Sequence, residues 1–337
     1  MPSFCRHNRL LQHCPICARE QDVELEPVIS SSAPRTGAER QTRSTASRRA
    51  AGKRPARGSA GGIAAADRSG LRIRRLERGA DDGYRSPLAP GLRSSLEAER
   101  LAQELGFGAT RLRALTEQPP GLYAEVAGDG DVEERSWLAF LIAYLCPLET
   151  DDPFASVREV RTPWSSAEPP RLQGVATGPR TAHDPDRPLR TIEAYLAWAA
   201  RAGSQAAAFT GDPGWSAERR FARVFERLAL PGLHRDARFD LLVTLGWLGV
   251  FELRPAELML GGADAVTVAA KRIFGIGDRL MLEGRAARFA AACALPLAAL
   301  DLGLYNWEHG DRISLGLGPR AEPNPDLVGG ARAALEL

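Results

Sequence analysis

The sequence predicts an all-α protein, in which a helical body follows a small N-terminal segment and a basic arm. Three observations support this fold class. Apolar residues recur at helical spacing through most of the chain after about residue 92, alternation typical of strands is scarce, and hydrophobic residues make up 44% of the 337 residues. That share is enough to form a sizeable buried core.

The N-terminal stretch FCRHNRLLQHCPICARE holds three of the five cysteines in the chain. Their spacing with a histidine, C-x-H-x6-C-x2-C, is typical of a tetrahedral site, and zinc suits such thiolate and imidazole ligands. Because so short a segment cannot fold without a metal, we expect a structural Zn²⁺ knuckle over residues 1–20. The expected ligands are Cys5, His7, Cys14 and Cys17, with His13 as the alternative fourth ligand. A redox pair of Cys14 and Cys17, or plain surface thiols, would also explain the pattern.

Residues 21–90 are rich in Ser, Ala, Gly, Arg and Pro and show no sustained periodicity, which predicts a basic flexible linker. Within it, residues 35–78 carry thirteen basic and three acidic side chains, a surplus of +10 in a chain whose total charge is +2. Such an arm suits a polyanion partner, and a solvated linker without a partner would look the same.

The helical body is expected over residues 91–320, with a C-terminal tail at 321–337. A Ser cap, helical periodicity and a closing glycine favour a first helix over 95–107, and the strongly apolar segment 132–149 favours a central core helix. Six prolines predict a long surface loop over 161–189. Helical patterns then follow almost without a break over 190–202, 216–229, 235–248, 263–273, 279–293 and 296–307. We expect about ten helices in the whole body.

No apolar run reaches the roughly 18–20 residues of a membrane span, and the start of the chain lacks an apolar signal region. We therefore expect a cytoplasmic protein whose cysteines are thiols or metal ligands. Cys146 and Cys293 lie alone in apolar helical segments and are expected to be inert core residues.

The segment KRIFGIGDRL places Gly275 and Gly277 between two helical patterns. This arrangement is typical of a helix-hairpin-helix, which holds a DNA backbone through amides at a helix N-terminus without reading the base sequence. The basic residues that flank the turn and would add phosphate contacts are Lys271, Arg272 and Arg279. An ordinary turn between two helices would explain the same short pattern.

A second candidate turn, LPGLHRDAR at 230–238, has His234 where a hairpin would have its second glycine. No aspartate follows it at a suitable distance. We interpret it as a helix turn or a secondary phosphate contact, with Arg235 and Arg238 as possible contributors.

Asp301 follows Gly277 by twenty-four residues and lies in the apolar segment LAALDLGLYNW. An unpaired carboxylate is costly in such surroundings. Asp301 is therefore expected to be either a helix N-cap or a working group of an active site.

The order of hairpin, helix and aspartate resembles the helix-hairpin-helix DNA glycosylase superfamily. The segments FCRHNRL, CPIC, FLIAYLCPLETDDPF and LDLGLYNW resemble, more narrowly, the alpha-glutamyl/putrescinyl thymine pyrophosphorylase family, clade 3. This likeness covers residues 1–20 and roughly 92–318. It implies a bacterial anti-phage DNA glycosylase that removes a hypermodified or glucosylated pyrimidine from phage DNA.

The resemblance assigns Gly275 and Gly277 to the hairpin and Asp301 to catalysis. It implies that the target nucleotide is flipped out and that ionised Asp301 stabilises an oxocarbenium-like sugar and activates water, which leaves an abasic site. The helix after the hairpin has no lysine early on, which argues for a monofunctional glycosylase without lyase chemistry. Phe274 stands where the family's hairpin has proline.

The expected pocket residues are Glu149 and Asp151, with Asp152 beside them, and Tyr305 and Asn306 after the catalytic aspartate. The acids could equally be solvated loop residues, and the aromatic segment that includes Trp307 could be core. Two other functions fit the same residues. One is a transferase of the same fold that modifies hydroxymethylated thymine in DNA, and the other is a non-enzymatic, zinc-dependent DNA-binding protein.

Overall fold

Helices are the only regular secondary structure in the part of the chain that the computed structural model describes, residues 79–166 and 169–337. The all-α prediction is therefore confirmed, with twelve helices in these residues against the ten or so expected. They are α2 (Ser95–Glu117), α3 (Leu122–Ala127), α4 (Val132–Leu145), α5 (Ala155–Val160), α6 (Arg190–Ala202), α7 (Gln205–Thr210), α8 (Ala217–Arg227), α9 (Arg235–Trp247), α10 (Ala265–Phe274), α11 (Arg279–Ala292), α12 (Leu297–His309) and α13 (Pro325–Ala334).

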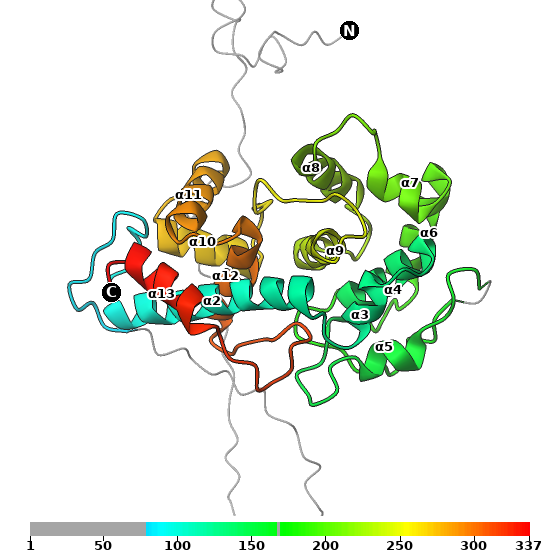
Figure 1. Ribbon diagram of the computed structural model, residues 1–337, viewed down its shortest axis with the longest axis horizontal. Coiled ribbons are helices and arrows are strands. Elements are labelled where there is room, and N and C mark those ends of the chain that lie inside the picture. The colour runs from blue at the N-terminus through cyan, green and yellow to red at the C-terminus, as the bar shows by residue number, and fades with distance from the viewer. Residues whose placement is uncertain (1–78, 167–168) are drawn as a thin grey trace, which may run out of the picture. The chain divides into compact units, whose positions relative to one another are not determined.

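The helices form two groups that α2 joins (Figure 1). In the middle group, α3–α9, the apolar helix α4 packs against α3, α7 and α9. In the C-terminal group, α10–α13, the buried helix α12 packs against α10 and α11. Because α2 contacts α12 and α13 as well as α9, it fixes the position of one group against the other.

Small residues let α2 and α12 approach closely. A Cβ atom on Gly108 of α2 would lie 2.2 Å from the carbonyl oxygen of Ala299, and one on Gly303 of α12 would lie 2.9 Å from a methyl carbon of Leu105. Neither distance is compatible with a larger residue unless the helices move apart. This contact sets the depth at which α12 carries Asp301 into the protein.

Polar caps fix where the helices of the C-terminal group begin. Asp264 accepts a hydrogen bond from the Thr267 amide at 2.9 Å before α10, and Asp278 accepts one from the Met281 amide at 3.0 Å before α11. Asn324 caps α13, whose first residue is a proline. Each cap satisfies an amide that would otherwise lack a partner in the first helical turn.

The packed chain extends beyond residues 91–320 at both ends. Tyr84, which falls in the expected linker, donates a hydrogen bond to the Leu335 carbonyl at 2.6 Å. The expected tail contains α13, and Val328 of this helix packs closely on Gly106 of α2. A Cβ atom built on Gly106 would lie 2.4 Å from a methyl carbon of Val328. The expected zinc knuckle at 1–20 and the arm at 35–78 lie outside the described residues.

Candidate functional site

A short turn joins α10 to α11 at the predicted hairpin. Gly275 adopts the left-handed conformation with φ of +63°, which favours glycine, and its amide donates to the Lys271 carbonyl at 2.9 Å. Gly275 and Gly277 are both exposed, and no heavy atom lies within 4 Å of a Cβ built on Gly277. The turn is therefore open to a ligand that approaches the start of α11.

The three basic residues beside this turn differ in how free they are. Lys271 is exposed and only reaches the Gly262 carbonyl at 3.4 Å, and Arg279 is exposed and forms no ion pair within the described residues. Arg272 is instead half-buried, ion-paired with Glu308 and placed over the Trp307 ring at 4.8 Å. Lys271 and Arg279 are thus the two that can meet a phosphate without breaking an ion pair.

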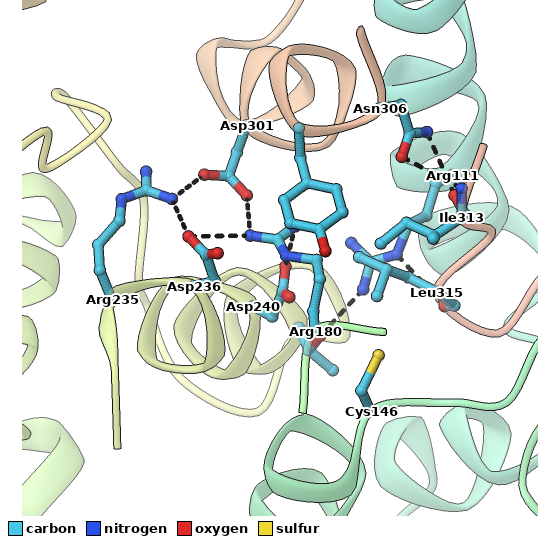
Figure 2. A network of polar contacts seen from close by, with 12 residues as sticks. Arg111, Cys146, Arg180, Arg235, Asp236, Asp240, Asp301, Asn306, Ile313 and Leu315 are labelled. Atoms are coloured by element: carbon cyan, nitrogen blue, oxygen red, sulfur yellow. Dashed lines mark hydrogen bonds and ion pairs between the residues drawn. The ribbon is translucent and has the colours of Figure 1, made fainter. Parts of the chain in front are cut away.

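Asp301 lies on α12 and is buried, with only 2% of its surface exposed. It is the fifth residue of a helix that follows Pro296, so the alternative of an N-cap does not apply. Its two oxygens accept from two different guanidinium groups: Oδ2 from Arg180 Nη2 at 2.8 Å, and Oδ1 from Arg235 Nη1 (Figure 2). Asp301 therefore holds two arginines together.

Arg180 comes from the proline-rich segment that was expected to be a surface loop. The loop does lack helices in its described part, yet the side chain of Arg180 is completely buried. The neighbouring Gly178 lets the loop backbone pass close to Pro147, because a Cβ on residue 178 would lie 2.1 Å from the Pro147 carbonyl oxygen. The guanidinium also stacks on the Tyr305 ring at 4.7 Å.

Two further carboxylates of α9 complete the cluster. Asp236 and Asp240 are one helical turn apart and therefore share a face of α9. Arg180 lies 3.5 Å from Asp236 Oδ1 and 3.4 Å from Asp240 Oδ1, and Arg235 donates to Asp236 Oδ1 at 3.0 Å. We call these five residues the Arg–Asp cluster: Arg180, Arg235, Asp236, Asp240 and Asp301.

Charge balance governs the protonation of the cluster. Burial alone would lower the pKa of Arg180, but the carboxylates of Asp240, Asp301 and Asp236 outweigh it and raise that pKa well above its usual value. Burial raises the pKa of Asp240 to about 6. For Asp236, burial is outweighed by Arg180 and Arg235, so its pKa is lowered and it is ionised at neutral pH.

A pocket of about 290 Å³ opens beside the cluster, between the middle and the C-terminal groups. Its wall includes three cluster residues, together with the start of α10 and two histidines: Pro179, Arg180, Thr181, His234, Arg235, Asp236, Asp264, Ala265, Tyr305 and His309. Two larger hollows, of about 450 and 550 Å³, contain no residue of the Arg–Asp cluster. The 290 Å³ pocket is therefore the candidate site.

Of the predicted pocket residues, Tyr305 is the one on this wall, where its hydroxyl donates to the Pro179 carbonyl at 3.3 Å. Asn306 is buried and bonds Glu104 at 3.2 Å and the Ile313 backbone. Glu149 accepts from the Ser314 amide at 2.8 Å, and exposed Asp151 lies 3.6 Å from Arg320. These three make contacts within the fold and do not line the pocket.

The second candidate turn contributes buried side chains to the site. Arg235 opens α9 and donates to Asp301 and to the Leu258 carbonyl, while Arg238 is half-buried and donates to the Phe225 carbonyl at 3.1 Å. Sequence reasoning did not single out Arg180, Asp236 or Asp240. The criterion applied to Asp301, a carboxylate in an apolar run, would also have selected Asp240 in FDLLVTLGW.

The predicted zinc ligands Cys5, His7, Cys14 and Cys17 lie outside the described residues, and within those residues no group of three or more metal-ligating side chains could hold a metal ion. Cys146 and Cys293 are free and buried, as expected, and burial raises the pKa of each thiol to about 12.

Across residues 79–166 and 169–337, no helix on its own is both long and apolar enough for a membrane span. Helices α11 and α12 meet that test only as a pair, across a bend of 105°.

Comparison of the chain with protein-family models, with curated proteins and with solved structures gave no match to any of them.

Proposed function

We propose that this protein is a DNA N-glycosylase, which hydrolyses the bond between a modified pyrimidine and its deoxyribose and leaves an abasic site. One observation carries the proposal. A pocket whose wall includes the buried, ion-paired carboxylate Asp236 lies at one end of α10, and an exposed glycine turn with exposed basic side chains lies at the other.

The pocket offers what this chemistry requires. When the bond from C1′ to the base nitrogen breaks, positive charge develops on the sugar, and a fixed carboxylate stabilises it. The Arg–Asp cluster holds its carboxylates in fixed orientations by guanidinium contacts of 2.8–3.5 Å. Because the charges are already oriented, little reorganisation is needed as the sugar becomes cationic.

The turn offers a hold on the strand. The N–H groups of Gly277 and Arg279 have no acceptor within the described residues, and the start of a helix favours an anion. Ten residues of α10 separate the turn from the pocket, which corresponds to about 15 Å of helix, or about four nucleotides along one strand. A strand held at the turn could therefore place a nearby flipped nucleotide at the pocket.

The N-terminal part of the chain fits the same proposal. The basic arm at 35–78 would add sequence-independent contacts to phosphates. The expected zinc knuckle, with Cys5, His7, Cys14 and Cys17 as ligands, would be structural, because four protein ligands leave no open position for water. Phage DNA with hypermodified or glucosylated bases is the proposed substrate, on the resemblance described above.

A second candidate function has one observation in its favour. Both oxygens of Asp301 are engaged by arginines, as in a cluster that only stabilises the fold. The protein would then bind DNA without chemistry.

The test is incubation of the full-length protein with unmodified and hypermodified phage DNAs, followed by mass spectrometry of the released bases and a count of abasic sites. We expect free modified base and an equal number of abasic sites. DNA that keeps an altered base would indicate the transferase. Tight binding without any change in the DNA would indicate the second candidate and would end the glycosylase proposal.

A further inference from the structure

We infer that Asp236, and not Asp301, is the carboxylate that meets the reacting sugar, and that Asp301 is a positioning residue that holds Arg180 and Arg235 in place. This inference rests on the proposed N-glycosylase function and assigns the roles of two carboxylates in its pocket. It departs from the catalytic role that the family resemblance gives to Asp301.

Asp301 has no oxygen left for a substrate. Each of its oxygens accepts from a guanidinium, the residue is 2% exposed, and it is not part of the pocket wall. Contact with a sugar would require at least one of these buried ion pairs to break. Leaving a buried charge without its partner lowers the folding equilibrium constant by several factors of ten. Asp301 therefore keeps both ion pairs in the folded protein.

Asp236 has one carboxylate oxygen that is free to contact a substrate. Its Oδ1 atom takes both arginines, at 3.0 Å from Arg235 Nη1 and 3.5 Å from Arg180 Nη2. Its Oδ2 atom has no hydrogen-bond partner in the described part of the chain (Figure 2) and is accessible to solvent. Asp236 also lines the pocket. The arginines thus fix the carboxylate through one oxygen and leave the other for a ligand.

The charge of the cluster supports the same assignment. Two guanidinium groups face three carboxylates in direct contact, which leaves one negative charge in excess when all three are ionised. The charge of Arg111 also acts on Asp240, but its hydrogen bonds go to Thr244, Tyr123 and the Leu315 carbonyl, and it makes no ion pair with Asp236. The excess charge is open to the pocket at Asp236 Oδ2, where a cationic sugar would be stabilised.

Base release and water addition at C1′ together make one hydrolysis. The bond from C1′ to the base nitrogen breaks and its electron pair leaves with the base. A water oxygen then bonds to C1′, one water proton passes to Asp236 Oδ2, and the departing base takes up a proton from solvent. Release of the proton from Asp236 restores the carboxylate, so no other reactant is needed.

The test uses two oligonucleotides, each as a duplex and as a single strand, with the full-length protein. In one, the central sugar is a pyrrolidine with a protonated nitrogen at the position of C1′, and in the other it is a neutral tetrahydrofuran. We expect the wild type to bind the cationic ring at least about tenfold more tightly than the neutral ring. We expect Asp236→Asn to bind both rings equally.

Two charge-balanced double variants separate the two aspartates. Arg235→Gln with Asp301→Asn and Arg235→Gln with Asp236→Asn have the same net charge and differ only in which carboxylate remains. We expect the first to keep the preference for the cationic ring and the second to lose it, with thermal unfolding to show that both are folded. If the double variants are unstable, Asp236→Asn alone decides, because it leaves both ion pairs of Asp301 in place.

The inference is overturned if the wild type shows no preference for the cation, if Asp236→Asn keeps the preference, or if the double variant that retains Asp236 loses it. The proposed function is judged separately, by whether the wild type releases any base from phage DNA. A wild type that releases no base but prefers the cationic ring through Asp236 would refute the glycosylase and leave the assignment of the contacting carboxylate intact.

Discussion

The two ends of α10 differ in how their charges are supported. At its start, charged side chains from α9, α12 and the loop before α6 are buried against one another beside the pocket. At its end, glycines and the exposed side chains of Lys271 and Arg279 face solvent with few contacts. Under the proposed function, a change at the pocket end should therefore alter stability together with chemistry, whereas a change at the turn should alter DNA binding alone.

The largest effect is expected from Arg180→Met. This change leaves the buried carboxylates of Asp301 and Asp240 without one of their cations, and loss of one partner from a buried ion pair costs about 3–5 kcal/mol. We expect a fall of that size in the free energy of unfolding, measured by urea denaturation.

The matched control is Arg158→Met, which removes an arginine from a pair with Asp152 whose side chains are 47% and 56% exposed. Exposed pairs contribute less than about 1 kcal/mol, so this variant should unfold close to the wild type. Equal losses of unfolding free energy in the two variants would show that the buried ion pairs of the cluster stabilise the fold no more than an exposed pair does.

A smaller loss is expected from Gly178→Ala, which tests how the loop delivers Arg180 to the cluster. The new Cβ would lie 2.1 Å from the Pro147 carbonyl oxygen, so the loop has to shift. Overpacking of this kind costs about 1–3 kcal/mol. Gly284→Ala in α11 is the control, because nothing lies within 4 Å of a Cβ built there. Alanine is also more favourable than glycine inside a helix by about 1 kcal/mol. The two alanines should change the melting temperature in opposite directions.

The sequence predicted the turn end of α10 better than the pocket end. Gly275, Gly277 and the helices beside them follow from patterns within a few residues, and such local signals were enough to place the turn and the all-α fold. The burial of Asp301 also followed, because its neighbours in sequence are apolar.

The partners of Asp301 could not be predicted in the same way. Arg180 is 121 residues from Asp301 in sequence and lies in a proline-rich loop whose composition is typical of the surface. Its burial depends on a contact between Gly178 and Pro147 that no periodicity encodes. Asp240 did carry a readable signal, a carboxylate in an apolar run, but its pairing with Arg180 depends on tertiary packing.

The stability of the pocket end should depend on pH through Asp240. The pKa of Asp240 is raised to about 6, by burial and by Asp301 and Asp236 against the opposing effect of Arg180 and Arg111. In the unfolded chain this pKa is about 3.9. Between pH 4 and 6 the folded state therefore binds a proton that the unfolded state does not, so Asp240 makes stability fall as the pH rises through this window.

Asp240→Asn removes this dependence. The unfolding free energy of the variant minus that of the wild type should rise by about 1–2 kcal/mol from pH 4.5 to pH 7. Urea denaturation at each pH measures this difference. His183, whose pKa is lowered by burial, acts in the opposite direction, but it is present in both proteins and cancels in the difference. A difference that stays constant with pH would mean that Asp240 is ionised throughout.

The smallest effect is expected at the turn, from Arg279→Gln. Arg279 is the first residue of α11 and is exposed without an ion pair in the described residues, so its loss should leave the unfolding free energy unchanged within about 0.5 kcal/mol. If it contacts one phosphate, the slope of log affinity for DNA against log salt concentration should become shallower by about 0.9.

Arg190→Gln is the matched control for the turn, because Arg190 is also an exposed arginine at the first position of a helix, α6, in the middle group. Both variants lose one positive charge, so a general loss of attraction to DNA would affect them equally. A change in salt slope confined to Arg279→Gln would place the DNA backbone at the glycine turn. Equal slopes would show that the turn is a structural connection, and the DNA would then have to be held elsewhere, with the arm at 35–78 as the first segment to test.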